Sequence, residues 1–197
     1  MAAPTLIVID VQCALEDPVY GRRNNPGAED NVARALGTWR ELGAPIVHVR
    51  HESMEPGGRF VRGTPGFDFK PEAQPLGGED VITKQANSAF IGTDLEARLR
   101  DRSVETVALA GLTTDHCCSS TARMAANLGF ETWVLGDAMA TFERRGPEGE
   151  QLDADLMHRT ALASLSGEFA EVLRTEEAIE RVRRDAASLR PVRRQAG

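Results

Sequence analysis

The chain has 197 residues, of which 41% are hydrophobic and 27% are charged. This length and composition are typical of one globular domain, which buries enough surface to fold without disulfide bonds or metals. They exclude a small extracellular scaffold that depends on disulfide bonds. The formal charge of −7 disfavours a general nucleic-acid or anionic-membrane surface. We therefore expect no nucleic-acid partner and no membrane partner.

The N-terminal sequence and the cysteines indicate where the protein works. The segment MAAPTLIVID has no basic residue before its apolar stretch and no cleavage-like site after it, so a secretion signal is not expected. The longest apolar runs are far shorter than the roughly 20 residues that span a bilayer. Cys13, Cys117 and Cys118 make an odd set with two adjacent members, which rarely bridge each other. A reducing cytoplasm is the expected location.

Six short apolar runs, rich in β-branched residues, are typical of buried strands. In chain order they cover residues 5–10, 45–49, 80–84, 106–111, 132–136 and 169–173. Helical periodicity predicts helices over 31–42, 94–100, 117–128, 151–165 and 176–189. The sequence Thr93-Asp-Leu-Glu96 predicts a capping box at the start of the second helix. Strands that alternate with helices predict an α/β fold: a three-layer α/β/α sandwich with a six-stranded parallel sheet.

Two stretches depart from this alternation. Residues 51–79 have no helical or strand periodicity, and their phenylalanines at 60, 67 and 69 favour a packed lid. The globular domain is predicted to cover residues 1–180, and a basic C-terminal tail 181–197. The arginines of that tail are Arg181, Arg183, Arg184, Arg190, Arg193 and Arg194, against the single acid Asp185. We expect the tail to be solvated.

In open parallel sheets, ligands bind outside the carboxyl ends of the strands. Asp10 ends the first predicted strand, Lys84 ends the third, and Cys117 begins the helix after the fourth. Each has an ordinary interpretation alone: a turn cap, a solvated strand end and a small buried hydrophobe. Their convergence on one edge predicts a site that combines a carboxylate, an ammonium and a thiol. Asp137, at the end of the fifth strand, is interpreted as a loop cap.

A carboxylate is a weak base for a thiol. The two pKa values are about 8.5 and 3.9 in water, so moving the proton costs roughly 6 kcal/mol. Lys84 and the helix N-terminus at Cys117 would favour the thiolate, while burial would raise the pKa of Asp10. The hypothesis is an anionic sulfur at Cys117. Because Lys84 would also stabilise ionised Asp10, its net effect depends on which group lies nearer, and this stays open at this point.

Four segments carry a resemblance to a known family. They are LIVIDVQ with Asp10 and Gln12, TKQANSAF with Lys84, AGLTTDHCCSSTARMAANLGF with Cys117, and HRTALASLSGEFAEVLRTEE from His158 onward. Each segment alone is a weak signal, but the order and spacing of all four are specific. Over about residues 4–178, the chain resembles the isochorismatase-like cysteine hydrolases, and in particular their cysteine amidohydrolase branch.

The resemblance implies a catalytic triad of Asp10, Lys84 and Cys117 and a cis peptide at Leu112-Thr113. The backbone N–H groups of Thr113 and Cys117 would form an oxyanion hole. The implied reaction is hydrolysis of a C–N bond in a small amide or ureido substrate through a thioester, without a cofactor. The family also implies a homodimer or a higher homo-oligomer.

Asn87, Phe90 and His51 are expected to bind the substrate, together with the 51–79 segment. The nicotinamidase branch of the family carries an Asp-x-His metal cluster after its second strand. The present chain has His48-Val-Arg-His51-Glu52 there, which lacks that aspartate pattern. Nicotinamidase activity and bound zinc are therefore disfavoured, and no metal is expected. His48 is interpreted as packed within its strand, and His158 as structural.

Three alternative functions stay open. Isochorismatase-type ether hydrolases belong to the same family but generally lack the cysteine. A Cys-dependent phosphatase is suggested by His116-Cys117 with Arg123, an HC-x5-R pattern, although its interior has no glycine for a phosphate loop. The third alternative is a catalytically silent binding protein. Cys118 is assigned to the buried position that follows the nucleophile in the family.

Overall fold

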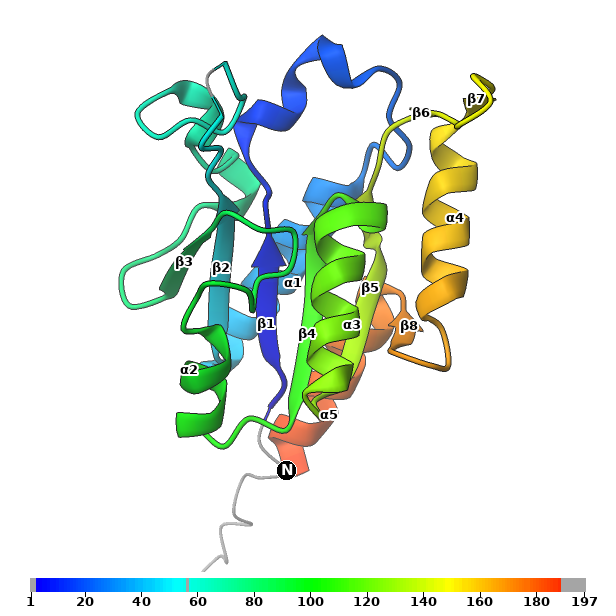
Figure 1. Ribbon diagram of the computed structural model, residues 1–197. Helices are drawn as coiled ribbons and strands as arrows, with labels where there is room; N and C mark the ends of the chain where they lie inside the picture. The colour runs from blue at the N-terminus through cyan, green and yellow to red at the C-terminus, as the bar shows by residue number, and fades with distance from the viewer. Residues whose placement is uncertain (1–2, 56, 189–197) are drawn as a thin grey trace, which may run out of the picture.

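A six-stranded parallel sheet forms the centre of the structure, a computed structural model that describes residues 3–55 and 57–188. The strand order is β3 (Asp80–Lys84), β2 (Ile46–His51), β1 (Thr5–Ile9), β4 (Thr106–Leu112), β5 (Glu131–Ala140) and β8 (Glu171–Leu173). Every neighbouring pair in this sheet is parallel. With helices on both faces, this confirms the predicted α/β/α sandwich (Figure 1).

The helices divide between the two faces of the sheet (Figure 1). One face carries α1 (Ala28–Leu42) and α5 (Thr175–Ser188), and the other carries α2 (Leu95–Asp101), α3 (Ser119–Asn127) and α4 (Ala154–Leu165). Along β1, Leu6 and Val8 lie in one core cluster with Trp39 of α1, whereas Ile7 and Ile9 lie in the opposite cluster. All five side chains are fully buried. Because both faces are covered, the strand is apolar throughout instead of alternating.

Most predicted helices and strands are present, although several begin or end at other residues than predicted. β5 continues to Ala140, past the predicted end at residue 136, because it stays paired with β4 after a register shift at Leu109/Gly111. Gly111 has φ +129°, and a Cβ there would lie 2.0 Å from the Ile9 carbonyl oxygen, so β4 can approach β1 closely only with glycine at this position. No described helix is long and apolar enough to cross a membrane.

The predicted capping box before α2 is wrong. The residue before this helix is Asp94, not Thr93, and its side chain makes no capping bond. The Thr93 hydroxyl instead donates to the Ala89 carbonyl and accepts from the Leu95 N–H. At α4, by contrast, the side chain of Asp153 accepts from the Leu156 N–H and caps the helix.

The predicted boundary at residue 180 falls inside α5. Val182 of this helix is fully buried, and Arg181 pairs with Glu171 at 2.7 Å and lies over the Trp133 ring. Residues 181–188 therefore belong to the packed domain and not to a solvated tail. The predicted tail arginines Arg190, Arg193 and Arg194 lie outside the described residues.

The 51–79 segment packs against the domain, as its phenylalanines predicted. It contains two short turns, η3 (Pro65–Phe67) and η4 (Pro71–Ala73), and both Phe67 and Phe69 are buried. The side-chain amide of Gln12 donates to the carbonyls of His51 and Phe67 and accepts from the His51 N–H. Gln12 thus ties the end of β2 and this segment to the chain that leaves β1.

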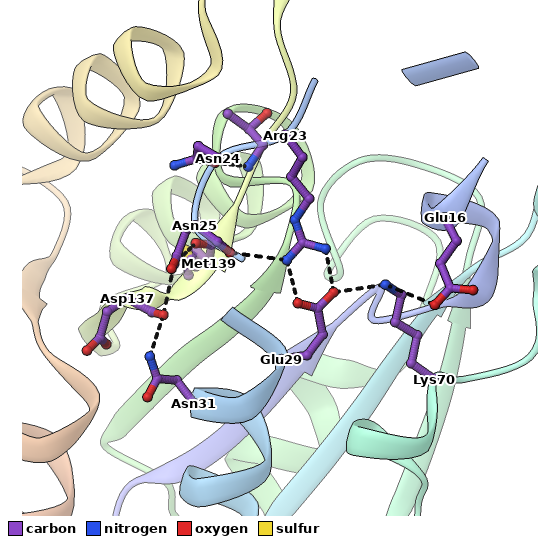
Figure 2. A network of polar contacts seen from close by, with 10 residues as sticks. Glu16, Arg23, Asn24, Asn25, Glu29, Asn31, Lys70, Asp137 and Met139 are labelled. Atoms are coloured by element: carbon purple, nitrogen blue, oxygen red, sulfur yellow. Dashed lines mark hydrogen bonds and ion pairs between the residues drawn. The ribbon is translucent and has the colours of Figure 1, made fainter. Parts of the chain in front are cut away.

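A buried ionic cluster adds a second tie (Figure 2). The Glu29 carboxylate pairs with the Arg23 guanidinium and, at 2.9 Å, with the Lys70 ammonium. Burial raises the pKa of Glu29, but the hydrogen bonds from Arg23 and Lys70 outweigh it and lower this pKa to about 2. The Lys70 N–H donates to the Val11 carbonyl at 2.9 Å. The cluster therefore fixes the backbone next to Asp10 against the 51–79 segment.

Candidate active site

The three predicted catalytic side chains meet at the carboxyl edge of the sheet. Asp10 follows β1, Lys84 ends β3, and Cys117 lies in the π-helical turn η5 (Thr114–Cys118) between β4 and α3. Lys84 Nζ is 2.6 Å from Asp10 Oδ2 and 3.2 Å from Cys117 Sγ. The residues Lys84 and Asp10 are 1% and 3% exposed. One buried ammonium thus bridges the carboxylate and the thiol.

The backbone at Asp10 turns sharply as it leaves β1. Asp10 has φ 51°, in the left-handed region that aspartate tolerates better than most residues. Its N–H donates to the Val49 carbonyl, and its own carbonyl accepts from the Gln12 N–H, each at 2.8 Å. These bonds hold the turn and place the carboxylate between β1 and Lys84.

The two carboxylate oxygens of Asp10 differ in their surroundings. Oδ2 accepts a hydrogen bond from Lys84. Oδ1 is buried and accepts no hydrogen bond from the other described residues. The Cys117 thiol lies beside this carboxylate, with its sulfur within 4.8 Å of a carboxylate oxygen. A buried carboxylate oxygen without other donors is a suitable acceptor for the thiol proton.

The surroundings of Cys117 favour its protonated thiol. Burial and the charge of Asp10 raise its pKa to about 12, and Lys84 offsets only part of this. Since Lys84 lies closer to Asp10 than to the sulfur, its charge chiefly stabilises the carboxylate. This answers the point that the sequence left open, since Lys84 lies nearer to Asp10 than to Cys117. The thiol proton must leave as the sulfur attacks.

Lys84 also contacts His51, at 3.3 Å from Nζ to Nδ1. An ammonium only donates, so Nδ1 accepts and the neutral ring carries its proton on Nε2. Burial and the charge of Lys84 lower the pKa of His51, which favours this neutral form. Asp10, His51 and Cys117 each place one possible metal-ligand atom here, and the three atoms lie within 4.8 Å of one another. This spacing could hold a metal. The ammonium of Lys84, which contacts all three side chains, already supplies a cation there.

A cavity of about 230 Å³ opens beside Cys117. It is lined by Asp10, Leu15, Tyr20, His51, Phe60, Asn87, Leu112, Thr113, His116, Cys117, Phe142 and Arg144. Asn87 and His51 are in this lining, as expected from the sequence, and Asn87 Oδ1 lies 3.9 Å from Cys117 Sγ. From the 51–79 segment, the cavity receives His51 and Phe60, whose rings meet edge to face.

Phe90 was expected to bind the substrate, and the structure places it outside the cavity lining. Its ring stacks on Phe130 with 6.1 Å between centroids, within the core cluster on the α2 and α3 side of the sheet. The Ala89 N–H donates to the hydroxyl of Thr121 on α3 at 3.0 Å. This bond holds the turn against α3, so the phenylalanine faces the core.

Sequence reasoning missed several cavity residues. Leu15 and Tyr20 come from short 3-10 turns after β1, and Phe142 and Arg144 lie at or just before β6 (Arg144–Arg145). β6 pairs antiparallel with β7 (Gln151–Leu152) in a small hairpin that was not predicted. Two-residue polar strands carry no hydrophobic periodicity, so no pattern in the sequence marked this part of the wall.

The turn that presents Cys117 is supported from several sides. The Leu112-Thr113 peptide is cis, as the resemblance implied, and Thr113 lines the cavity. The Nδ1 atom of His158, on α4, lies 2.7 Å from the Thr114 hydroxyl. This contact agrees with the interpretation of His158 as a structural residue. Cys118 is fully buried, as assigned.

The interpretation of His48 as packed within its strand holds, whereas Asp137 lies inside β5 and caps a helix instead of a loop. His48 is fully buried within β2 and contacts Glu79 at 2.8 Å. Asp137 Oδ1 accepts from the N–H and the hydroxyl of Thr175, at 2.7 and 2.6 Å, and so caps the start of α5.

The phosphatase alternative is not supported by the geometry. Arg123 lies on α3, donates to the Ser164 hydroxyl at 2.7 Å and stacks over the Phe169 ring. It is not part of the cavity lining. A guanidinium held on that side cannot bind a phosphate at Cys117.

Comparisons with known proteins agree with this architecture. The isochorismatase domain family matches residues 4–177. The uncharacterized isochorismatase family protein YrdC of Bacillus subtilis is 42% identical over 174 residues, which cover 88% of this chain and 93% of that protein. The crystal structure of a putative isochorismatase-family hydrolase from Chromobacterium violaceum has a TM-score of 0.90 and 42% identity, and covers 92% of this chain and 94% of its own.

A relative that is named for its activity is also similar over most of the chain. Maleamate amidohydrolase of Pseudomonas putida is 28% identical and covers 91% of this chain and 87% of its own length. The fold and the site define a class of α/β/α hydrolases with an acid, a lysine and a cysteine at the carboxyl edge of the sheet. The chain belongs to the isochorismatase family and is a hydrolase of that family.

Proposed function

We propose that this protein hydrolyses a C–N bond in a small amide or ureido compound through a thioester on Cys117. The observation that carries the proposal is the Lys84 ammonium, 2.6 Å from Asp10 and 3.2 Å from Cys117, both of which line the cavity. The similarity to maleamate amidohydrolase supports an amide as the substrate class. The presence of Cys117 favours amide cleavage over the ether hydrolysis of relatives that lack the cysteine.

In the first half of the reaction, Asp10 accepts the thiol proton as Cys117 Sγ attacks the substrate carbonyl carbon. Lys84 stays paired with both the Asp10 carboxylate and the Cys117 sulfur. Negative charge that passes from the carboxylate to the sulfur therefore stays beside the same cation. The carbonyl oxygen becomes negative, and the backbone N–H groups of Thr113 and Cys117 are assigned to stabilise it. Asp10 then returns the proton to the nitrogen, the C–N bond breaks, and ammonia or an amine leaves.

In the second half, water attacks the thioester and Asp10 serves again as the base. The C–S bond breaks, Cys117 recovers its proton from Asp10, and the acid product leaves. The His51 Nε2–H and the Asn87 side chain, which line the cavity, are assigned to hold polar groups of the substrate. A cavity of about 230 Å³ with apolar walls suits a molecule of roughly ten heavy atoms.

The proposal is tested by ammonia release from a panel of carbamoyl, ureido and aliphatic amides. Cys117→Ala is expected to lose activity by a factor of about 10⁴ or more, because it removes the attacking atom. Cys13→Ser is the matched control, since Cys13 is a partly exposed thiol outside the cavity lining, and it is expected to retain wild-type turnover. Undiminished turnover by Cys117→Ala would refute the thioester, and failure of the wild type on the whole panel would refute the substrate class.

A further inference from the structure

Arg144 brings a guanidinium into the wall of the cavity that holds Cys117. Its Nε donates to Asp115 Oδ2 at 3.2 Å. The Asp115 side chain is only 8% exposed and also accepts a hydrogen bond from the Thr141 hydroxyl. The hydrogen bond from Thr141 and the charge of Arg144 outweigh burial and lower the pKa of Asp115. A buried carboxylate behind the wall thus fixes the direction of this guanidinium.

Most donors of this guanidinium have no protein acceptor. A guanidinium has five N–H donors. One is used by Asp115, and Nη2 lies 3.5 Å from His116 Nδ1. Within residues 3–55 and 57–188, no other hydrogen bond from the Arg144 side chain is found, and 28% of the side chain is exposed. The remaining donors are available to a molecule in the cavity.

Two charged residues on the cavity wall differ in where their counterions lie. Besides the histidines His51 and His116, the lining has one acidic residue, Asp10, and one strongly basic residue, Arg144. Asp10 is paired with buried Lys84 beside it. The counterion of Arg144, Asp115, lies outside the lining. Around Arg144, the wall is formed by the rings of Tyr20 and Phe142, which contact each other.

We propose that the substrate carries a carboxylate that Arg144 binds while its amide or ureido carbonyl lies at Cys117. The inference rests on the proposed function and narrows it to small acidic amides. A guanidinium fork binds a carboxylate through two parallel N–H···O bonds, which lysine cannot reproduce. Of the lining residues, Arg144 is the one with a guanidinium fork, so it also sets which end of the molecule faces the thiol.

The test compares matched acid and neutral substrates. Succinic acid monoamide and its methyl ester differ in the one negative charge, and kcat/KM is measured for the amide nitrogen of each. The wild type is expected to prefer the acid by about 10- to 100-fold, the range of one charge-assisted hydrogen-bonded pair. Arg144→Gln is expected to lose this preference, chiefly by raising KM for the acid, and Arg144→Lys is expected to restore part of it.

Arg145→Gln is the control. Arg145 is the next residue of the same strand, is exposed, bonds to the Gly149 carbonyl and lies outside the cavity lining, so this variant is expected to keep the full preference for the acid. Calorimetric binding of both compounds to the Cys117→Ala protein provides a readout without turnover. Equal kcat/KM for acid and ester, equal binding of both, or a preference retained in Arg144→Gln would overturn the inference. Absence of any amide turnover would count against the proposed function, while the calorimetry would still decide the role of Arg144.

Discussion

Replacement of Asp10 by asparagine is expected to slow hydrolysis by about 10²- to 10⁴-fold and, at the same time, to make Cys117 more reactive towards alkylating agents at neutral pH. Asparagine fills the same space but cannot accept the thiol proton. Burial contributes most to the raised pKa of the thiol, the charge of Asp10 adds to it, and Lys84 opposes both. Without the carboxylate, the ammonium beside the sulfur favours the thiolate, so the thiol pKa falls.

The rate of alkylation by iodoacetamide, followed at Cys117 against pH, measures this effect. In the wild type, the rate should keep rising to the highest pH at which the protein stays folded, because the thiol pKa is about 12. In Asp10→Asn, the same rise should occur at lower pH. The Cys13→Ser background removes labelling of the other partly exposed thiol. An unchanged pH profile, or slower alkylation in Asp10→Asn, would contradict the assignment of Asp10 as the proton acceptor.

Replacement of Lys84 by methionine is expected to abolish hydrolysis and to lower the free energy of unfolding by about 3–5 kcal/mol. Lys84 and Asp10 are both buried and 2.6 Å apart. Methionine has a similar length and fills the same space, but it leaves the Asp10 carboxylate without its cation. A buried charge without a partner is far less stable than the intact pair.

Chemical denaturation measures this loss, and the double variant Lys84→Met/Asp10→Asn separates charge from packing. The double variant is expected to recover much of the lost stability, because no uncompensated charge remains. It should stay inactive, since the acceptor of the thiol proton and the cation paired with it are both missing. A wild-type free energy of unfolding for Lys84→Met, or a double variant less stable than the single one, would show that the pair does not carry buried opposite charges.

The sequence was sufficient for the sheet and for the residues fixed to it. β3 was predicted at its observed ends, Asp80–Lys84, because an apolar run bounded by polar residues has few other structures open to it. Asp10 and Lys84 could be placed together for the same reason, since each ends a parallel strand and such ends share one edge. Cys117 follows β4, the strand next to β1 in the sheet, so the topology also places its thiol near Asp10.

What the sequence could not show depends on distances and on irregular backbone. The protonation of Cys117 depends on its burial and on Lys84 lying closer to Asp10 than to the sulfur, and no pattern encodes these features. Arg144 reaches the cavity from a two-residue strand without periodicity. Phe90 faces the core because of a single hydrogen bond between Ala89 and Thr121, which links residues far apart in the chain.

Interception of the acyl-enzyme by hydroxylamine tests most directly whether Cys117 carries the acyl group during turnover. A thioester can pass its acyl group to hydroxylamine as well as to water. We predict that the wild type, with an amide that it hydrolyses, forms the hydroxamate at the expense of the acid, while Cys117→Ala forms neither. Release of the acid alone, at a rate and in a yield that hydroxylamine leaves unchanged, would mean that water attacks the substrate directly and that Cys117 is not the nucleophile.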